Sequence, residues 1–240
     1  MVGNCSCQGY YGDRIVEVER VSKIYQQGKV VFKALDGVSL SIERGEFTAL
    51  AGPSGSGKTT LLNLIGGLDL PDSGKVVLGG NDYSRMGDGE RADLRLEKIG
   101  FVFQSYNLIP VLTAAENVEY ILRLQNVEKT ERISRVRSIL DEVGLQDKHN
   151  SRPDELSGGQ QQRVAVARAI VSNPDVVLAD EPTANLDSKT GEKLLEMMKV
   201  MNEERQATFI FATHDNMVMD FAKRIVSLHD GRVAGDRKKK

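Results

Sequence analysis

Apolar and polar side chains alternate along the first 50 residues with the two-residue period of a β-strand. The alternation runs through residues 14–25, 30–34 and 38–42, and a turn at 44–46 leads into the apolar run 46–51. A further short strand is expected at 75–78. The pattern predicts an N-terminal β-rich layer that leads into a buried strand ending at Ala51.

From about residue 88 the apolar positions follow the helical period instead. We expect helices at 90–98, 113–125 and 130–143, with a short buried strand at 99–103. Thr113 and Glu116 have the spacing of a capping box, and Gly144 closes the helix that ends at Val143. We therefore predict a helical subdomain at residues 104–157. The apolar stripes of its helices are interpreted as part of the hydrophobic core, and contacts with a partner protein are the alternative.

After residue 158 strands and helices alternate again. The runs 176–180, 207–212 and 224–228 are continuously apolar, as in buried parallel strands, and helices are expected at 161–171, 188–204 and 216–222. The pattern predicts one α/β domain over 14–233, with its core in 14–103 and 158–233. Residues 1–13 and 234–240 are expected to be flexible tails.

Composition narrows the protein class only modestly. A chain of 240 residues with a net charge of −2 buries enough surface to need no disulfides and shows no bias toward nucleic acid. Cys5 and Cys7 are interpreted as free thiols, with a cloning remnant or lipidation as the alternative. Neither a signal peptide nor a membrane-spanning run is visible, so we expect a soluble chain that reaches a membrane only through a partner.

The segment between the strand 46–51 and the apolar run 61–65 matches the phosphate-loop pattern G-x-x-x-x-G-K-[ST] at every specified position. It consists of Gly52, Pro53, Ser54, Gly55, Ser56, Gly57, Lys58, Thr59 and Thr60. Glycines let successive N–H groups face phosphate oxygens, and a helix N-terminus adds positive charge. Lys58 is predicted to reach the outer phosphates and Thr59 to bind Mg²⁺. A nucleotide site is expected here.

A second anion-binding element is predicted at Ser157, Gly158, Gly159 and Gln160, ahead of an Arg- and Ala-rich helix. Open backbone amides at a helix N-terminus attract anions. Because one loop already holds the phosphates of one nucleotide, two such elements in one chain suggest that two chains each contribute half of a site. A Ser-Gly-Gly turn by itself is commonplace.

Two acids, Asp180 and Glu181, end the apolar strand 176–180. Asp180 is placed to hold the Mg²⁺ shell and Glu181 to polarise an attacking water. Taken alone, adjacent acids could simply be a solvated strand end. Following the two predicted anion-binding elements, they favour hydrolysis of a bound nucleotide over a solvated strand end.

These segments, in this order, resemble the ATP-binding subunit of ABC transporters over about residues 14–233. The resemblance rests on 52–60, Gln104, 156–160, 176–181, 185–187 and 213–215. It implies a P-loop NTPase core with an N-terminal antiparallel β layer and an inserted α-helical subdomain. It also implies that ATP and Mg²⁺ are cofactors and that a second copy of the chain pairs head to tail.

The resemblance also implies roles for residues outside the two loops. Tyr25 matches the aromatic residue that stacks on adenine. Gln104 matches the glutamine that senses Mg²⁺ and the attacking water. His214 matches the histidine that contacts the γ-phosphate and acts with Glu181, and Asp187 matches the loop that crosses the dimer interface.

The amino-acid sequence of residues 100–118 and 178–187 is similar to that of the lipoprotein-release (Lol) and MacB-type export ATPases. One difference is Ala184, where those proteins usually have glycine. Members of this group serve integral membrane permeases, so a peripheral position on the cytoplasmic face of the inner membrane is expected. The cargo could be lipoprotein, peptide, drug or lipid. A force-transmitting FtsE-like ATPase is the alternative. A soluble ABC ATPase acting on nucleic acid or ribosomes is disfavoured, since the only basic cluster is 237–240.

Overall fold

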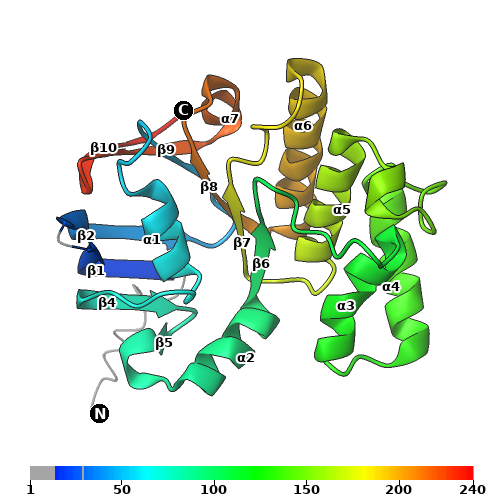
Figure 1. The fold of residues 1–240 in the computed structure, drawn as a ribbon, viewed down its shortest axis with the longest axis horizontal. Helices are drawn as coiled ribbons and strands as arrows, with labels where there is room; N and C mark the ends of the chain where they lie inside the picture. The colour runs from blue at the N-terminus through cyan, green and yellow to red at the C-terminus, as the bar shows by residue number, and fades with distance from the viewer. Residues whose placement is uncertain (1–13, 29, 240) are drawn as a thin grey trace, which may run out of the picture.

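The computed structural model describes residues 14–28 and 30–239, so Cys5, Cys7 and the expected tail 1–13 lie outside the described residues. The described chain forms two β-sheets with α1 between them, and a group of helices at the far side of the larger sheet (Figure 1). Within these residues none of the helices combines the length and the apolar character that crossing a membrane requires.

The smaller sheet is antiparallel and has the strand order β2-β1-β4-β5. Its strands are β1 (Arg14–Gln27), β2 (Val30–Glu43), β4 (Ser73–Leu78) and β5 (Asn81–Asp82). The two strands expected at 30–34 and 38–42 are one strand. Their ladder with β1 continues past Gly37 because register shifts near Val21 and Lys23 absorb the irregularity.

The larger sheet has the order β10-β9-β3-β8-β7-β6 and is parallel except for its β10 edge. Its strands are β3 (Phe47–Ala51), β6 (Ile99–Val102), β7 (Val176–Asp180), β8 (Thr208–Thr213), β9 (Arg224–His229) and β10 (Arg232–Lys238). Every residue of β3 and β8 is buried. This matches the continuous apolar runs, because both faces of a parallel sheet are covered.

Helices cover both faces of the larger sheet. They are α1 (Lys58–Ile65), α2 (Asp88–Lys98), α3 (Ala114–Leu124), α4 (Lys129–Glu142), α5 (Gly158–Ile170), α6 (Ser188–Arg205) and α7 (Asn216–Phe221). Short 3₁₀ turns lie at η1 (Tyr83–Arg85) and η2 (Pro153–Glu155). The core is split: α1 packs with the smaller sheet on one face of the larger sheet, and α3–α6 pack on the other.

The apolar stripe of the second predicted subdomain helix is mostly core. Val136, Ile139, Leu140 and Val143 are buried with α3 and α5, whereas Ile133 is 55% exposed. Thr113 caps α3 as the spacing predicted: its hydroxyl accepts from the Glu116 N–H, and the Glu116 carboxylate accepts from the Thr113 N–H. Local sequence therefore sets where α3 begins.

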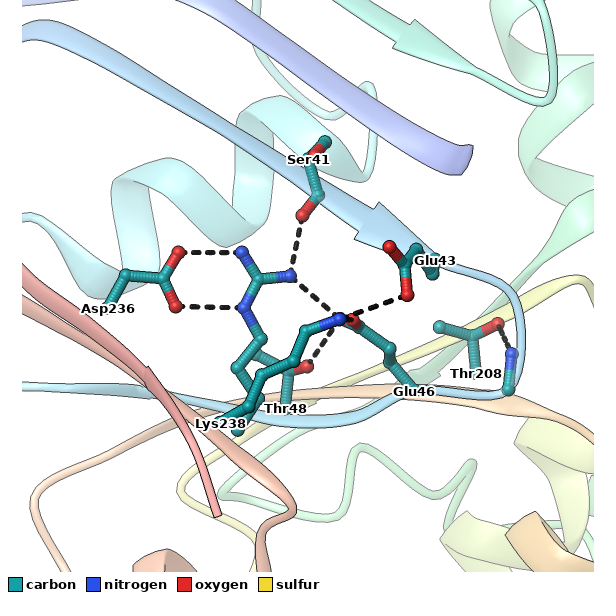
Figure 2. A network of polar contacts seen from close by, with 9 residues as sticks. Ser41, Glu43, Glu46, Thr48, Thr208, Asp236 and Lys238 are labelled. Atoms are coloured by element: carbon teal, nitrogen blue, oxygen red, sulfur yellow. Dashed lines mark hydrogen bonds and ion pairs between the residues drawn. The ribbon is translucent and has the colours of Figure 1, made fainter. Parts of the chain in front are cut away.

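The expectation of a flexible tail from residue 234 is wrong as far as Lys239, because β10 pairs with β9 up to Lys238. Asp236 accepts two hydrogen bonds from Arg224, of 2.9 and 2.7 Å. The Lys238 ammonium lies 3.0 Å from Glu43 and 3.1 Å from Glu46, as Figure 2 shows. The basic cluster is therefore partly neutralised by acids that lie almost 200 positions earlier in the chain, out of reach of any local pattern.

Candidate functional site

Two of the three glycines in the loop between β3 and α1 have no room for a side chain. A Cβ on Gly57, where φ is +100°, would lie 2.6 Å from the Ala34 carbonyl oxygen. A Cβ on Gly52 would lie 2.3 Å from the carbonyl oxygen of Leu228. The loop is thus held tightly between β2 and β9, and its turn leads directly into the first residue of α1.

Lys58 begins α1 and is only 6% exposed. Its ammonium donates to the carbonyl oxygens of Gly52 (2.8 Å) and Pro53 (2.9 Å), so the side chain curls back over the loop. A cation held at the N-terminal end of a helix is suited to binding phosphate, as the sequence predicts for Lys58.

Oxygen ligands lie next to this cation. The Thr59 hydroxyl donates to Asp180 Oδ1 at 3.3 Å, and Asp180 ends β7. Burial raises the pKa of Asp180, and the hydrogen bond from Thr59 opposes the rise. One carboxylate and one hydroxyl beside a phosphate site fit Mg²⁺, which keeps several waters and binds phosphate oxygens. Among residues 14–28 and 30–239, no cluster of three or more His, Cys, Asp or Glu forms a complete metal site.

Glu181 follows Asp180 in a left-handed conformation, with φ of +45°. Such a backbone costs about 1–3 kcal/mol for a non-glycine residue and persists only where its surroundings hold it. Here Oε1 lies 2.6 Å from His214 Nδ1 and Oε2 accepts from the Thr213 hydroxyl at 3.0 Å. Because β7 and β8 are parallel neighbours, their carboxyl ends bring the acid and the histidine together.

These groups line one cavity of about 340 Å³. The predicted residues that the structure brings together there are Ser54, Gly55, Gly57, Lys58, Thr59, Thr60, Gln104, Asp180, Glu181 and His214. Two lining residues were missed by sequence reasoning, Phe32 and Ala34. The sequence offered one signal for them, the aromatic Phe32 within the predicted strand 30–34. That strand lies next to the loop in the fold but is distant from it in the sequence.

Tyr25 lies beside this cavity and is not part of its lining. Its hydroxyl donates to Asp69 Oδ2 at 2.9 Å, and the Lys23 ammonium lies 5.4 Å from the centre of its ring. Burial and the Asp69 carboxylate raise the pKa of Tyr25. The adenine-stacking role predicted for Tyr25 stays a prediction.

The second anion-binding element forms the N-terminus of α5, away from the cavity lining. Ser157 caps this helix: the Gln160 N–H donates to Ser157 Oγ at 3.3 Å, and the Ser157 N–H donates to Gln160 Oε1 at 2.9 Å. Neither residue lines the cavity, nor do Gly158 and Gly159. The structure therefore does not bring the two segments predicted to bind anions into one site within one chain.

Asp187 caps α6, where its carboxylate accepts from the Thr190 N–H at 3.1 Å, and the hydrogen bonds from Thr190 lower the pKa of Asp187. Just before it, Asn185 donates from its amide to the Gln104 carbonyl oxygen at 2.8 Å. The loop that carries Asp187 is thus tied to the glutamine of the cavity, a link that the sequence pattern did not indicate.

Comparison with known proteins identifies the family. A family model described as "ABC transporter" matches residues 35–184, more than half of the chain. An uncharacterized ABC transporter ATP-binding protein of Thermotoga maritima is 49% identical over 222 residues, which cover 92% of this chain and 94% of that protein. The macrolide export ATP-binding/permease protein MacB of Aggregatibacter actinomycetemcomitans is 41% identical over 94% of this chain and 35% of its own length.

A solved structure agrees with the sequence matches. The dimeric post-hydrolysis state of the ATP-binding cassette MJ0796 of Methanocaldococcus jannaschii, bound to ADP and Pi, has a TM-score of 0.86 and 45% identity. The alignment covers 94% of this chain and 99% of that one. The expected fold class, the family and the ATP-hydrolysing activity are confirmed. This chain belongs to the ABC transporter family and is one of its ATP-binding, ATP-hydrolysing subunits.

Proposed function

We propose that this subunit powers an inner-membrane permease of the lipoprotein-release/MacB type, which exports or extracts a lipoprotein, peptide, drug or lipid. MacB, a relative that matches 94% of this chain, is named as both an ATP-binding protein and a permease. The subunit would then lie on the cytoplasmic face of the membrane, attached through its permease.

The observation that carries this proposal is an apolar groove of about 450 Å³ between the larger sheet and helices α2, α3 and α5. Its apolar lining includes Leu68, Leu96, Ile99, Phe101, Phe103, Ile109, Tyr120 and Ile121. Leu68 and Tyr120 are 49% and 43% exposed. Contiguous exposed apolar side chains mark a surface that a partner covers.

Two arginines define the chemistry of the partner. Arg95 donates to the Gly67 carbonyl oxygen at 2.7 Å, and Arg168 donates to the carbonyl oxygens of Tyr106 and Asn107 at 2.8 and 2.5 Å. Both line the groove and bond backbone carbonyls there. A permease segment with apolar side chains and a carboxylate would match this groove, since a charge-assisted pair with arginine favours a carboxylate.

The catalytic cycle follows from the separation of the two anion-binding elements. In a head-to-tail pair, residues 157–160 of one copy close over the γ-phosphate that Lys58 of the other copy holds. Thr59, Asp180 and Gln104 would hold Mg²⁺, which would supply positive charge beside the phosphate oxygens. Glu181 orients and deprotonates the attacking water, and His214 contacts the γ-phosphate. Binding of ATP closes the pair, and hydrolysis reopens it.

The decisive experiment is native purification of the subunit from detergent-solubilised membranes, followed by identification of its partner. A permease with four membrane spans and a large extracytoplasmic domain supports the proposal. A six-span importer core with a binding protein would contradict it. Co-purification of a cell-wall hydrolase regulator would indicate the FtsE-like, force-transmitting class. If the subunit were instead washed off the membranes and its ATPase activity were stimulated by nucleic acid, it would belong to the soluble ABC ATPases.

A matched pair of variants tests the groove. Leu68→Glu introduces a carboxylate into the groove on a side chain of similar size. Val200→Glu introduces the same carboxylate on α6, outside the groove, and Leu68 and Val200 are both 49% exposed. We expect Leu68→Glu to abolish co-purification of the partner and Val200→Glu to leave it unchanged. Equal retention in both variants would show that the partner docks elsewhere.

A further inference from the structure

Gln162 is a buried glutamine whose polar atoms are only partly paired. It lies near the start of α5, and none of its surface is exposed. Its side-chain amide donates to the Pro182 carbonyl oxygen at 2.9 Å, whereas its Oε1 has no hydrogen-bond partner among the described residues. Most buried polar groups in proteins are hydrogen-bonded, so this side chain is an exception that needs a physical reason.

The stability of the fold does not supply that reason. Burying a carbonyl oxygen without a partner typically costs more free energy than one neutral hydrogen bond contributes. An unbranched apolar side chain of the same length would fill the same space without that cost. The value of Gln162 therefore lies in what its one hydrogen bond holds in place.

That hydrogen bond holds the residue directly after Glu181. The Glu181 backbone is left-handed, with φ of +45°, although a residue before proline ordinarily prefers extended backbone. The chain is fixed on both sides of this point: the Glu181 N–H donates to the Ala212 carbonyl oxygen at 2.9 Å, and the Pro182 carbonyl accepts from Gln162. Proline has no N–H, so its carbonyl is the one backbone group through which another element can hold it.

The two anchors come from different directions. The Ala212 carbonyl belongs to β8, and the side-chain contacts of Glu181 with Thr213 and His214 lie at the end of the same strand. Gln162 instead reaches the turn from α5, which packs on one face of the larger sheet. A segment held from one side can still swing, whereas a second anchor from another element fixes its direction.

We propose that Gln162 is a positioning residue for ATP hydrolysis, which holds the Pro182 carbonyl and thereby fixes the direction in which the Glu181 carboxylate points. The inference rests on the proposed role of Glu181 and adds a residue that acts through it. Gln162 does not line the nucleotide cavity, so it touches neither the phosphates nor the attacking water. Its loss therefore affects turnover and not the affinity for ATP.

Gln162→Met tests this role, because it removes the hydrogen bond and keeps an unbranched side chain of similar length. We expect kcat for ATP hydrolysis to fall about tenfold to hundredfold, as a misplaced catalytic group causes, with equilibrium ATP binding unchanged. The midpoint of urea unfolding should stay at or above the wild-type value, since the variant also removes the unpaired Oε1. Gln162→Leu, with a different apolar shape, should lose turnover to the same extent.

A double-mutant cycle with Glu181→Gln separates positioning from a general defect of the fold. In Glu181→Gln the acid is already lost, so adding Gln162→Met should lower the residual turnover no further. Single-turnover hydrolysis measures these slow residual rates. A further loss in the double variant, as large as that in Gln162→Met alone, would show that Gln162 acts on something other than Glu181 and would overturn the inference.

Gln125→Met is the matched control, because the Gln125 amide also donates to a distant backbone carbonyl, that of Leu96, at 2.8 Å. Gln125 lies at the end of α3 and outside the cavity lining, so this variant should turn over ATP like the wild type. Wild-type turnover in Gln162→Met would overturn the inference, as would a lowered unfolding midpoint, which would show that the amide serves the fold. Wild-type turnover in Glu181→Gln would instead refute the proposed role of the acid itself, and the inference with it.

Discussion

Glu181 is held by three separate features of the chain. Its backbone is left-handed, and its carboxylate oxygens contact His214 and the Thr213 hydroxyl. Both carboxylate oxygens are therefore engaged by protein groups from the end of β8. These contacts hold the carboxylate in one orientation, as the general-base role proposed for Glu181 requires.

Replacing Glu181 by Gln should separate binding from hydrolysis. The amide keeps the size of the side chain but cannot take a proton, so we expect turnover to fall about 10²–10⁴-fold while ATP affinity is kept. Steady-state hydrolysis and ATP binding measure the two effects. Glu192→Gln, at an exposed position of α6, is the control and should be neutral. Wild-type turnover in Glu181→Gln would remove this residue from the role.

At the scale of elements, the site depends on how closely the strands and helices approach one another. β6 leads into the loop with Gln104, and it packs against α5 at Gly100. A Cβ on Gly100 would lie 2.1 Å from the Ala169 carbonyl oxygen and 3.1 Å from the Ala169 Cβ. A backbone oxygen in a buried helix cannot move aside as a flexible side chain would. The helix and the strand can meet only because residue 100 has no side chain.

Gly100→Ala should therefore destabilise the fold by about 1–3 kcal/mol or more, as overpacking of a core does. The midpoint of urea unfolding measures this loss. The control is Gly89→Ala in α2, where a Cβ would meet nothing within 4 Å. Since alanine is the better helix former, this control should be stabilised by up to about 1 kcal/mol. Equal midpoints for the two variants would contradict the close approach of β6 and α5.

The β9–β10 hairpin should show a defined pH dependence through Asp236. Hydrogen bonds from Arg224 lower the pKa of Asp236 below 3.8, so its stabilising effect is complete above pH 3.8 and is lost as the pH falls through the lower, folded-state value. Asp236→Asn should cost about 1–2 kcal/mol at neutral pH, a modest value because the Asp236 side chain is 40% exposed. The difference from wild type in urea unfolding should shrink below pH 3.8. A difference that persisted in acid would point to packing instead of charge.

At the scale of the whole molecule, the two segments predicted to bind anions do not meet within one chain. The loop 52–60 lines the cavity, and Ser157 caps α5 outside that lining. A related cassette with 45% identity is dimeric in its post-hydrolysis state. The arrangement suits a pair of chains in which each completes the site of the other.

Turnover per chain should therefore rise with protein concentration, while ATP binding to the loop should not depend on it. Hydrolysis measured over a dilution series, with ATP binding measured in parallel, checks this. Ser157→Arg should abolish turnover and keep ATP binding, because it changes only the element that serves the neighbour. A constant turnover per chain down to the lowest measurable concentration would argue against a shared site.

The sequence alone predicted those features whose determinants are local. The glycine loop, the Thr113 capping box and the buried strands β3, β7 and β8 each depend on neighbouring residues. Their period, their glycines and their caps act over a few positions, and so the family, the α/β fold and the ATP-hydrolysing activity could be predicted from them.

Only the tertiary structure decided the features that join distant segments. β10 pairs with β9 as far as Lys238, whose side chain contacts Glu43 and Glu46, so the expected tail is a strand. Phe32 lines the cavity although it lies more than twenty positions before Lys58, while Tyr25 lies beside it and bonds Asp69. Such contacts form only when folding brings the ends of separate strands together. Their partners cannot be chosen by a local pattern of hydrophobic and polar residues, because that pattern specifies which face of an element is buried and not what it is buried against.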